Sequence, residues 1–111
     1  MSAWKYLLVE DILPAVVITM NRPEQRNALS TELMREMIDA FVQQSQRPEC
    51  RVIILRGAGP VFSAGHDLRE LLNRTLDQER EIFNVCVDLM QTIQRIPQPV
   101  IASVHGVATA A

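Results

Sequence analysis

The stretch VIILRGAGPVFSAGHDLREL, residues 52–71, decides how this chain is organised. It opens with the apolar run Val52–Leu55, which predicts a strand buried on both faces. It closes inside the range Leu68–Leu72, where a short helix is expected. Between the two stand the small residues 63–65 and then His66 and Asp67. Small side chains at a strand-to-helix junction allow a ligand to approach the backbone closely.

Three more strands and two longer helices are predicted around this stretch. The strands are Lys5–Asp11, Ala15–Met20 and Val100–Val104. One helix has Ser30 as its N-cap and ends near Arg47-Pro48, and the other starts at a capping-box pair, Thr75 and Gln78, and ends at Pro97. Strands that alternate with helices predict an α/β fold with a largely parallel sheet.

Each long helix carries a wide apolar stripe, and we expect both stripes to lie in the core. The first stripe is Leu33, Met34, Met37, Ile38, Phe41 and Val42, and the second is Ile82, Phe83, Cys86, Val87, Met90 and Ile93.

Composition excludes several classes of protein. The chain has 111 residues, of which 48% are hydrophobic, enough for one modest core. A net charge of −2 without a basic stripe argues against a nucleic-acid partner. No apolar stretch reaches the roughly 18 residues of a membrane helix, and the first residues do not resemble a signal peptide, so a cytoplasmic location is expected. Cys50 and Cys86 lack metal-site spacing, which predicts two reduced thiols and no metal.

Residues 106–111 repeat the pattern seen in residues 52–71, because a glycine and small residues follow a predicted strand. The first turn of a helix has backbone N–H groups without partners inside the helix, and they favour negative charge nearby. Two such junctions can direct two donors at one oxygen, which is an oxyanion hole. The candidate donors are the N–H groups of His66 and Ala111. Because the chain stops at this point, we expect it to be a fragment of a longer protein.

Three motifs in order resemble the enoyl-CoA hydratase/isomerase (crotonase) family. They are NRPEQRNALS (21–30), VIILRGAGPVFSAGHDL (52–68) and PQPVIASVHGVATAA (97–111). The resemblance implies that residues 1–111 are the N-terminal portion of a single crotonase-like domain, a truncated spiral of ββα units. It also implies homotrimers, often paired into hexamers.

The resemblance further implies how the site works. The N–H groups of His66 and Ala111 would hold the thioester oxygen of an acyl-CoA and stabilise an enolate. Arg26 would meet a CoA phosphate. The residues implied to line the CoA site are Arg26, Asn27, Ala28, Leu29, Ala64, Asp67 and Leu68. No separate cofactor is expected because the substrate carries CoA, and no membrane partner is expected.

The sequence departs from the family pattern at the site. Small residues are usual at the His66 position, so His66 is expected to narrow the acyl pocket or add a polar contact. Many relatives have glycine where Ala110 and Ala111 stand. The glutamates of hydratases lie beyond Ala111, and a general acid and base are needed for hydration. We therefore expect these 111 residues to be inactive alone.

The resemblance leaves several functions open. The first is an enoyl-CoA hydratase, which adds water to a 2-enoyl-CoA. The alternatives are isomerisation, decarboxylation or thioester hydrolysis of an acyl-CoA, and a non-catalytic acyl-CoA binder. If the protein is eukaryotic and a transit peptide is missing, the mitochondrial matrix replaces the cytoplasm as its location.

Structural roles compete with functional ones at single residues. His66 can be a surface-loop histidine, although its motif favours the backbone donor, and His105 is expected to be structural. Asp67 is expected to cap the short helix first and to act in catalysis second. Glu70 is expected to be a solvated helix carboxylate.

Two residues of the first motif have structural alternatives, as does one cysteine. Arg26 can be an exposed cation instead of a phosphate contact. Asn27 is expected to hold its loop through backbone hydrogen bonds. Cys86 is expected to be buried and inert.

Overall fold

The computed structural model describes residues 4–72 and 74–108, and its first elements are β1 (Leu7–Ile12) and β2 (Ala15–Met20). These strands pair antiparallel, and the Leu13–Pro14 peptide bond in their turn is cis. β3 (Val52–Gly57) pairs parallel to β2, and β4 (Val100–Ala102) pairs parallel to β3. The strand order is β1-β2-β3-β4, so the predicted, largely parallel sheet is confirmed.

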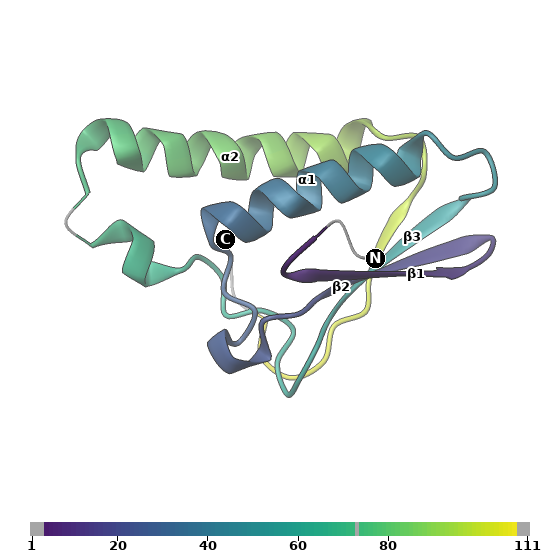
Figure 1. Cartoon of the computed structure of the whole chain (residues 1–111), viewed down its shortest axis with the longest axis horizontal. Coiled ribbons are helices and arrows are strands. Elements are labelled where there is room, and N and C mark those ends of the chain that lie inside the picture. The colour runs from purple at the N-terminus through teal and green to yellow at the C-terminus, as the bar shows by residue number, and fades with distance from the viewer. Residues whose placement is uncertain (1–3, 73, 109–111) are drawn as a thin grey trace.

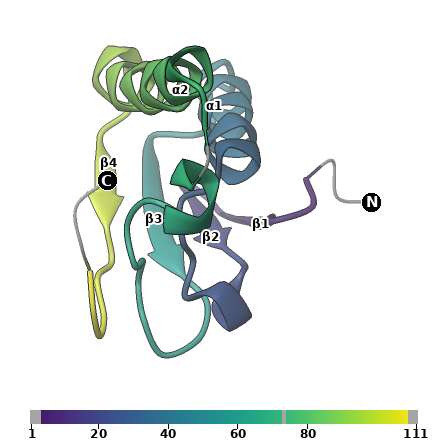
Figure 2. The same ribbon diagram turned by 90° about the vertical axis from the view of Figure 1, so that its left-hand side faces the viewer.

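Two long helices lie on one face of this sheet (Figure 1). They are α1 (Thr31–Ser45) and α2 (Leu76–Arg95). Figure 2 shows α2 above the β4 side of the sheet, with α1 beside it. Short 3-10 helices, η1 (Pro23–Gln25) and η2 (Leu68–Leu71), occupy the connections.

The helix caps form as predicted from the sequence. Ser30 accepts a hydrogen bond from the Leu33 N–H at 3.1 Å, which stabilises the first turn of α1. Thr75 and Gln78 form a reciprocal capping box at the start of α2. Bonds of this kind span three residues, so the local sequence is sufficient to specify them.

The core lies between the sheet and the two helices. It contains Leu7, Val16, Ile18 and Met20 from the hairpin, Leu33, Met34, Met37 and Phe41 from α1, and Ile82, Cys86 and Leu89 from α2. Both cysteines are free and buried. Free thiols were predicted for both, and burial was predicted for Cys86. Burial also raises the pKa of the Cys50 thiol.

Two burial predictions are wrong. β3 is not buried on both faces, because Ile53 and Leu55 are buried whereas Val52 and Ile54 are only half-buried. The reason is that the helices cover only one face of the sheet.

The predicted stripe of α2 is also incorrect in part, since Phe83, Val87 and Met90 are 57%, 51% and 41% exposed. α2 packs on α1 through two members of the predicted stripe, Ile82 and Cys86, together with Leu89, which was not predicted. Val42 of α1 is likewise 39% exposed.

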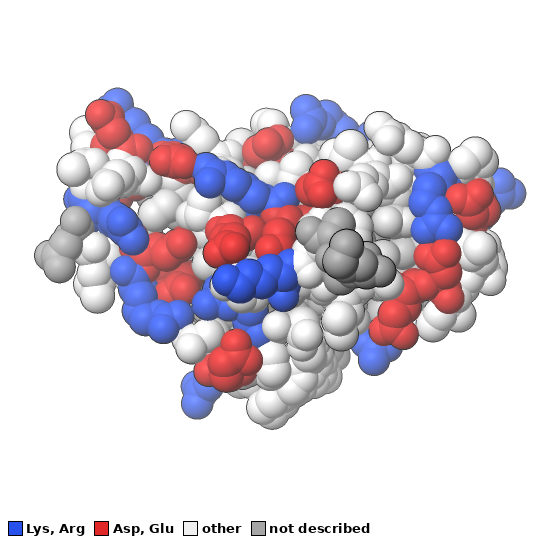
Figure 3. Space-filling model, viewed as in Figure 1, with Lys and Arg blue, Asp and Glu red and all other residues white. Residues whose placement is uncertain are grey.

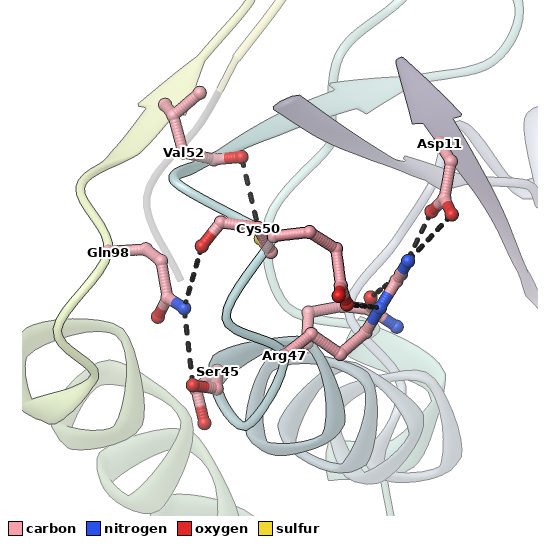
Figure 4. A network of polar contacts seen from close by, with 8 residues as sticks. Asp11, Ser45, Arg47, Cys50, Val52 and Gln98 are labelled. Carbon is pink, nitrogen blue, oxygen red and sulfur yellow. Dashed lines mark hydrogen bonds and ion pairs between the residues drawn. The ribbon is translucent and has the colours of Figure 1, made fainter. Parts of the chain in front are cut away.

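A polar network holds the ends of the elements farthest from the candidate site (Figure 4). Arg47 donates two hydrogen bonds to the Asp11 carboxylate, at 2.9 and 2.7 Å, and so joins the end of α1 to β1. These bonds lower the pKa of Asp11. Gln98 donates to the carbonyls of Ser45 and Cys50 at 3.2 and 3.1 Å. The network therefore connects α1, the start of β3 and the segment before β4.

Candidate functional site

The connections that follow β2, β3 and β4 gather at one end of the sheet, below it in Figure 1 and again in Figure 2. They contain the first, second and third sequence motifs. Ligands of open α/β sheets bind beyond the carboxyl ends of parallel strands. The fold therefore brings the three motifs to the end of the sheet where a ligand site is expected.

Asn27 holds two of these connections together. Its side chain is 0% exposed. The amide oxygen accepts from the Arg22 N–H at 2.9 Å, and the amide nitrogen lies 2.9, 3.1 and 3.1 Å from the carbonyl oxygens of Ala58, Val61 and Phe62. The expectation that Asn27 fixes its loop through backbone hydrogen bonds is confirmed. Its amide group is fully engaged inside the protein, and a CoA contact would have to use other atoms.

Gly57 allows the second connection to pass this close to Asn27. A Cβ atom at Gly57 would lie 2.4 Å from the carbonyl oxygen of Phe62 and 2.8 Å from the Asn27 amide nitrogen. Both distances are too short for a real side chain. The glycine that ends β3 is therefore required by the polar contacts of Asn27.

The junction itself is bound to the segment that precedes α1. Leu29 donates its N–H to the Gly65 carbonyl at 2.7 Å and accepts from the Asp67 N–H at 3.3 Å, and it forms a parallel bridge with His66. In a parallel bridge one residue makes both hydrogen bonds. The residue opposite it directs its own N–H and C=O away from the partner strand. The N–H of His66 is thus directed away from Leu29, and no hydrogen bond engages it within residues 4–72 and 74–108.

Ser63, Ala64 and Gly65 shape the approach to His66. Ser63 donates its hydroxyl to the Asn27 carbonyl at 2.9 Å and accepts from the Gly65 N–H at 3.1 Å. Ala64 donates to the Arg26 carbonyl at 2.9 Å. Gly65 has φ of +82°, a left-handed conformation that costs glycine little and other residues much more. The small side chains of residues 63–65 therefore allow the backbone to follow this tight path.

The His66 side chain packs against the exposed face of α2. Its ring meets the ring of Phe83 edge-on, with centroids 6.1 Å apart. Its Nδ1 atom is buried, and among the described residues it has no hydrogen-bond partner. His66 is thus half-buried, and the alternative of a plain surface-loop histidine does not describe this environment.

The other predicted site residues differ widely in exposure. Arg26, Ala64 and Leu68 are exposed, with Leu68 at 71%. Ala28 and Leu29 are buried at 9% and 7%. Arg26 and Asn27 are consecutive non-glycine residues with φ of 53° and 51°, an uncommon conformation. The structure therefore places these residues in one region but does not by itself assign them a ligand.

The two carboxylates that follow His66 are both engaged. Asp67 is 7% exposed and caps η2 by accepting from the Arg69 N–H at 3.1 Å, as predicted. It also pairs with the Arg69 guanidinium at 3.2 Å, which raises the pKa of Arg69. Glu70 accepts from both the N–H and the hydroxyl of Thr31, at 2.8 and 2.9 Å. The prediction that Glu70 is merely solvated is wrong, because it binds the N-terminus of α1.

His105 has the structural role that was expected of it. Its Nε2 atom lies 2.6 Å from the carbonyl oxygen of Gly59 and links the segment after β4 to the connection after β3. Phe62 donates to the carbonyls of His105 and Val107, at 3.0 and 3.1 Å, and reinforces this link. The second predicted donor, Ala111, lies outside the described residues.

The comparison with known sequences identifies the family of this chain. The sequence pattern of the family described as "Enoyl-CoA hydratase/isomerase" matches residues 14–111. The chain belongs to the enoyl-CoA hydratase/isomerase family. All three motifs at the site lie within the matched residues.

The names of similar proteins refer to more than one activity. Enoyl-CoA hydratase domain-containing protein 3, mitochondrial, from Danio rerio is 46% identical over 95 residues, which cover 85% of this chain and 33% of that protein. The Gly-His-Asp-Leu form of the junction, residues 65–68, indicates this group within the family. Human Delta(3,5)-Delta(2,4)-dienoyl-CoA isomerase, mitochondrial, is 34% identical over 100 residues, which cover 80% of this chain and 30% of the isomerase.

Solved structures of the family have the same fold. The crystal structure of an enoyl-CoA hydratase from Bacillus anthracis matches with a TM-score of 0.89 and 34% identity, over 94% of this chain and 41% of that one. Human enoyl-CoA hydratase domain-containing protein 3 matches with a TM-score of 0.87 and 32% identity, over 92% of this chain and 41% of that one. The predicted crotonase fold is confirmed. The chain spans about a third of the length of the curated relatives it matches.

The part of the chain that the structure describes contains neither a membrane-spanning helix nor a group of side chains suited to a metal ion. No helix there is long and apolar enough to cross a bilayer. No group of three or more His, Cys, Asp or Glu side chains in that part could hold a metal ion. On the face shown in Figure 3, acidic and basic side chains are interspersed.

Sequence reasoning missed two contacts that build the site. The hydroxyl of Ser63 joins the first and second motifs, and Glu70 joins the junction to α1. A serine among small residues is a weak signal for the first contact. No signal in the sequence indicated the second, because Thr31 and Glu70 are 39 residues apart.

Proposed function

We propose that this chain binds an acyl-CoA thioester and that the His66 N–H donates a hydrogen bond to the thioester carbonyl oxygen. The observation that carries the proposal is the bridge between Leu29 and His66, which turns the His66 N–H away from its neighbouring segment and leaves it unbonded among the described residues. A donor that is held in place by the surrounding backbone stabilises a developing oxyanion without reorganisation. Ala111 remains the predicted second donor.

The proposed activity of the whole protein is the hydration of a 2-enoyl-CoA. Membership of the family supports thioester chemistry, and the names of similar proteins include hydratases. Hydration also requires a general acid and base. Asp67 and Glu70 do not fill this role in the proposal, since one caps η2 and the other binds Thr31.

Two other functions have specific support. Similarity to a dienoyl-CoA isomerase favours double-bond isomerisation as the second candidate. The engagement of both carboxylates beside His66 favours a non-catalytic acyl-CoA binder as the third. Crotonyl-CoA and a dienoyl-CoA are each incubated with the full-length protein, and the mixtures are separated by chromatography. A hydrated product, an isomerised product or no product then distinguishes the three functions.

The test of binding compares two ligands by isothermal titration calorimetry. Butyryl-CoA is a saturated thioester that cannot be hydrated, and S-butyl-CoA is the thioether that lacks only the carbonyl oxygen. One hydrogen bond to that oxygen predicts that the thioester binds about fivefold more tightly. Equal affinity for the two ligands, or no binding of either, would overturn the proposal.

Variants of His66 separate its backbone from its side chain. His66→Pro removes the N–H, and we expect it to abolish the preference for the thioester. His66→Ala keeps the N–H and measures what the imidazole contributes to binding. Thermal unfolding of both variants shows whether a lost preference reflects a lost fold.

Assembly and location are part of the same proposal. Trimers or hexamers are expected from the family resemblance, and sedimentation velocity measures the assembly state directly. Several similar proteins are named as mitochondrial, which supports the mitochondrial matrix as an alternative to the cytoplasm.

A further inference from the structure

Glu70 occupies the N-terminus of α1 although it belongs to η2. Its Oε1 atom accepts from the Thr31 N–H at 2.8 Å and from the Thr31 hydroxyl at 2.9 Å. Thr31 is the first residue of α1, and its N–H has no partner inside that helix. A carboxylate is favourable at this end of a helix because of the helix dipole. Glu70 thus satisfies one of the free N–H groups of α1.

These contacts join the same two segments that meet at His66. Leu29 exchanges backbone hydrogen bonds with Gly65 and Asp67, at 2.7 and 3.3 Å. Leu29 lies two residues before Thr31, and Asp67 lies three residues before Glu70. The segments 29–31 and 65–70 are therefore bound together on both sides of Asp67, and the His66 N–H lies within the bound region.

Apolar packing is only one part of what holds η2 in this position. No residue of η2 is fully buried and Leu68 is 71% exposed, although Leu71 is partly buried and packs against the core. Glu70 itself borders surface hollows, which it shares with Thr31 and with charged side chains such as Arg35 and Arg74. The position of η2 consequently depends on the Asp67 cap and on the hydrogen bonds between Glu70 and Thr31, in addition to the packing of Leu71.

We propose that Glu70 is a positioning residue for the oxyanion hole. It anchors η2 to the N-terminus of α1 and thereby sets the direction in which the His66 N–H points. The inference rests on the proposed function, because it concerns the donor assigned there. It predicts that the carbonyl-dependent part of acyl-CoA affinity requires the Glu70 carboxylate, although Glu70 does not touch the ligand.

The test measures butyryl-CoA and S-butyl-CoA binding to the wild type and three variants by calorimetry. In Glu70→Ala we expect the roughly fivefold preference for the thioester to fall to about one, with thioether affinity changed less than about twofold. Glu70→Gln keeps a neutral acceptor for Thr31, and we expect it to restore part of the preference. Glu32→Ala is the matched control, since Glu32 is an exposed carboxylate in the same first turn of α1.

The outcomes separate this inference from the proposed function. If the wild type does not prefer the thioester, the His66 donor is overturned, and Glu70 loses its proposed role with it. If the wild type prefers the thioester and Glu70→Ala retains that preference, only the role of Glu70 is overturned. An equal loss of affinity for both ligands in Glu70→Ala would show that Glu70 has only a structural role. That result would also overturn the proposed positioning role.

A second readout follows the bridge without any ligand. Hydrogen exchange of the Leu29 and Asp67 amides, followed by NMR, reports the two backbone bonds beside His66. We expect Glu70→Ala to accelerate the exchange of both amides by about fivefold relative to the wild type and to Glu32→Ala, because opening the bridge then breaks about one hydrogen bond fewer. Unchanged exchange in Glu70→Ala would contradict the proposed anchoring.

Discussion

Replacing Asn27 with alanine should destabilise the protein severely, because the side chain is the main polar link between two connections. The amide oxygen accepts from Arg22 at 2.9 Å, and the amide nitrogen serves the carbonyls of Ala58, Val61 and Phe62. The side chain is 0% exposed, so water does not replace these bonds in the folded protein without rearrangement. Asn27→Ala therefore leaves buried backbone groups without partners.

The magnitude follows from the number of bonds and the backbone conformation. An amide NH₂ group has two N–H donors, so Asn27 makes about three full hydrogen bonds, and each contributes on the order of 1 kcal/mol. Alanine at the φ of 51° found at Asn27 costs about 1 kcal/mol more. The expected loss is about 4 kcal/mol, which is a large part of the roughly 5–15 kcal/mol typical of a domain.

Urea unfolding followed by circular dichroism measures this loss. Asn27→Gly removes the same side chain but accepts the left-handed backbone, so it should be about 1 kcal/mol more stable than Asn27→Ala. Asn84→Ala, in the exposed part of α2, is the control and should change stability by less than about 0.5 kcal/mol. A loss of under about 1 kcal/mol in Asn27→Ala would refute the assignment of Asn27 as the main link.

Two further predictions concern the junction after β3 and the polar network that contains Arg47 and Asp11. Gly65→Ala should cost about 1–3 kcal/mol in urea unfolding because alanine resists the φ of +82°, whereas Ala64→Gly should cost less than Gly65→Ala. Arg47 lowers the pKa of Asp11, so the contribution of Asp11 to stability is full above about pH 4 and is lost as the pH falls through the lowered folded pKa. Asp11→Asn should therefore melt at a lower temperature than wild type at pH 7, and the two should converge in strong acid; a constant difference at every pH would contradict this.

Part of the candidate site was predictable because its residues act through local geometry. The junction after β3 was located from an apolar run followed by small residues, and Asp67 was expected to cap η2. Asn27 was expected to bond to backbone groups, and it does. The assignment of the His66 and Ala111 N–H groups as oxyanion donors stays a prediction, as does the CoA contact of Arg26.

Other parts of the site were not predictable, because they join segments that are distant in the chain. The bridge between Leu29 and His66 and the bonds between Thr31 and Glu70 depend on where η2 meets α1. Glu70 carries no local sign of this partner, and a solvated carboxylate was the natural expectation for it. Only the folded chain shows that its charge binds a helix terminus.

The sequence by itself determined the order of strands and helices, the helix caps and the α/β class. These follow from periodicity and from hydrogen bonds that span a few residues, as at Ser30 and Thr75. The tertiary structure decided which residues of the apolar stripe of α2 enter the core. Ile82 is buried, whereas Phe83 is 57% exposed. The physical reason is that burial depends on the neighbouring surface of α1, and an apolar side chain does not encode which neighbour will cover it.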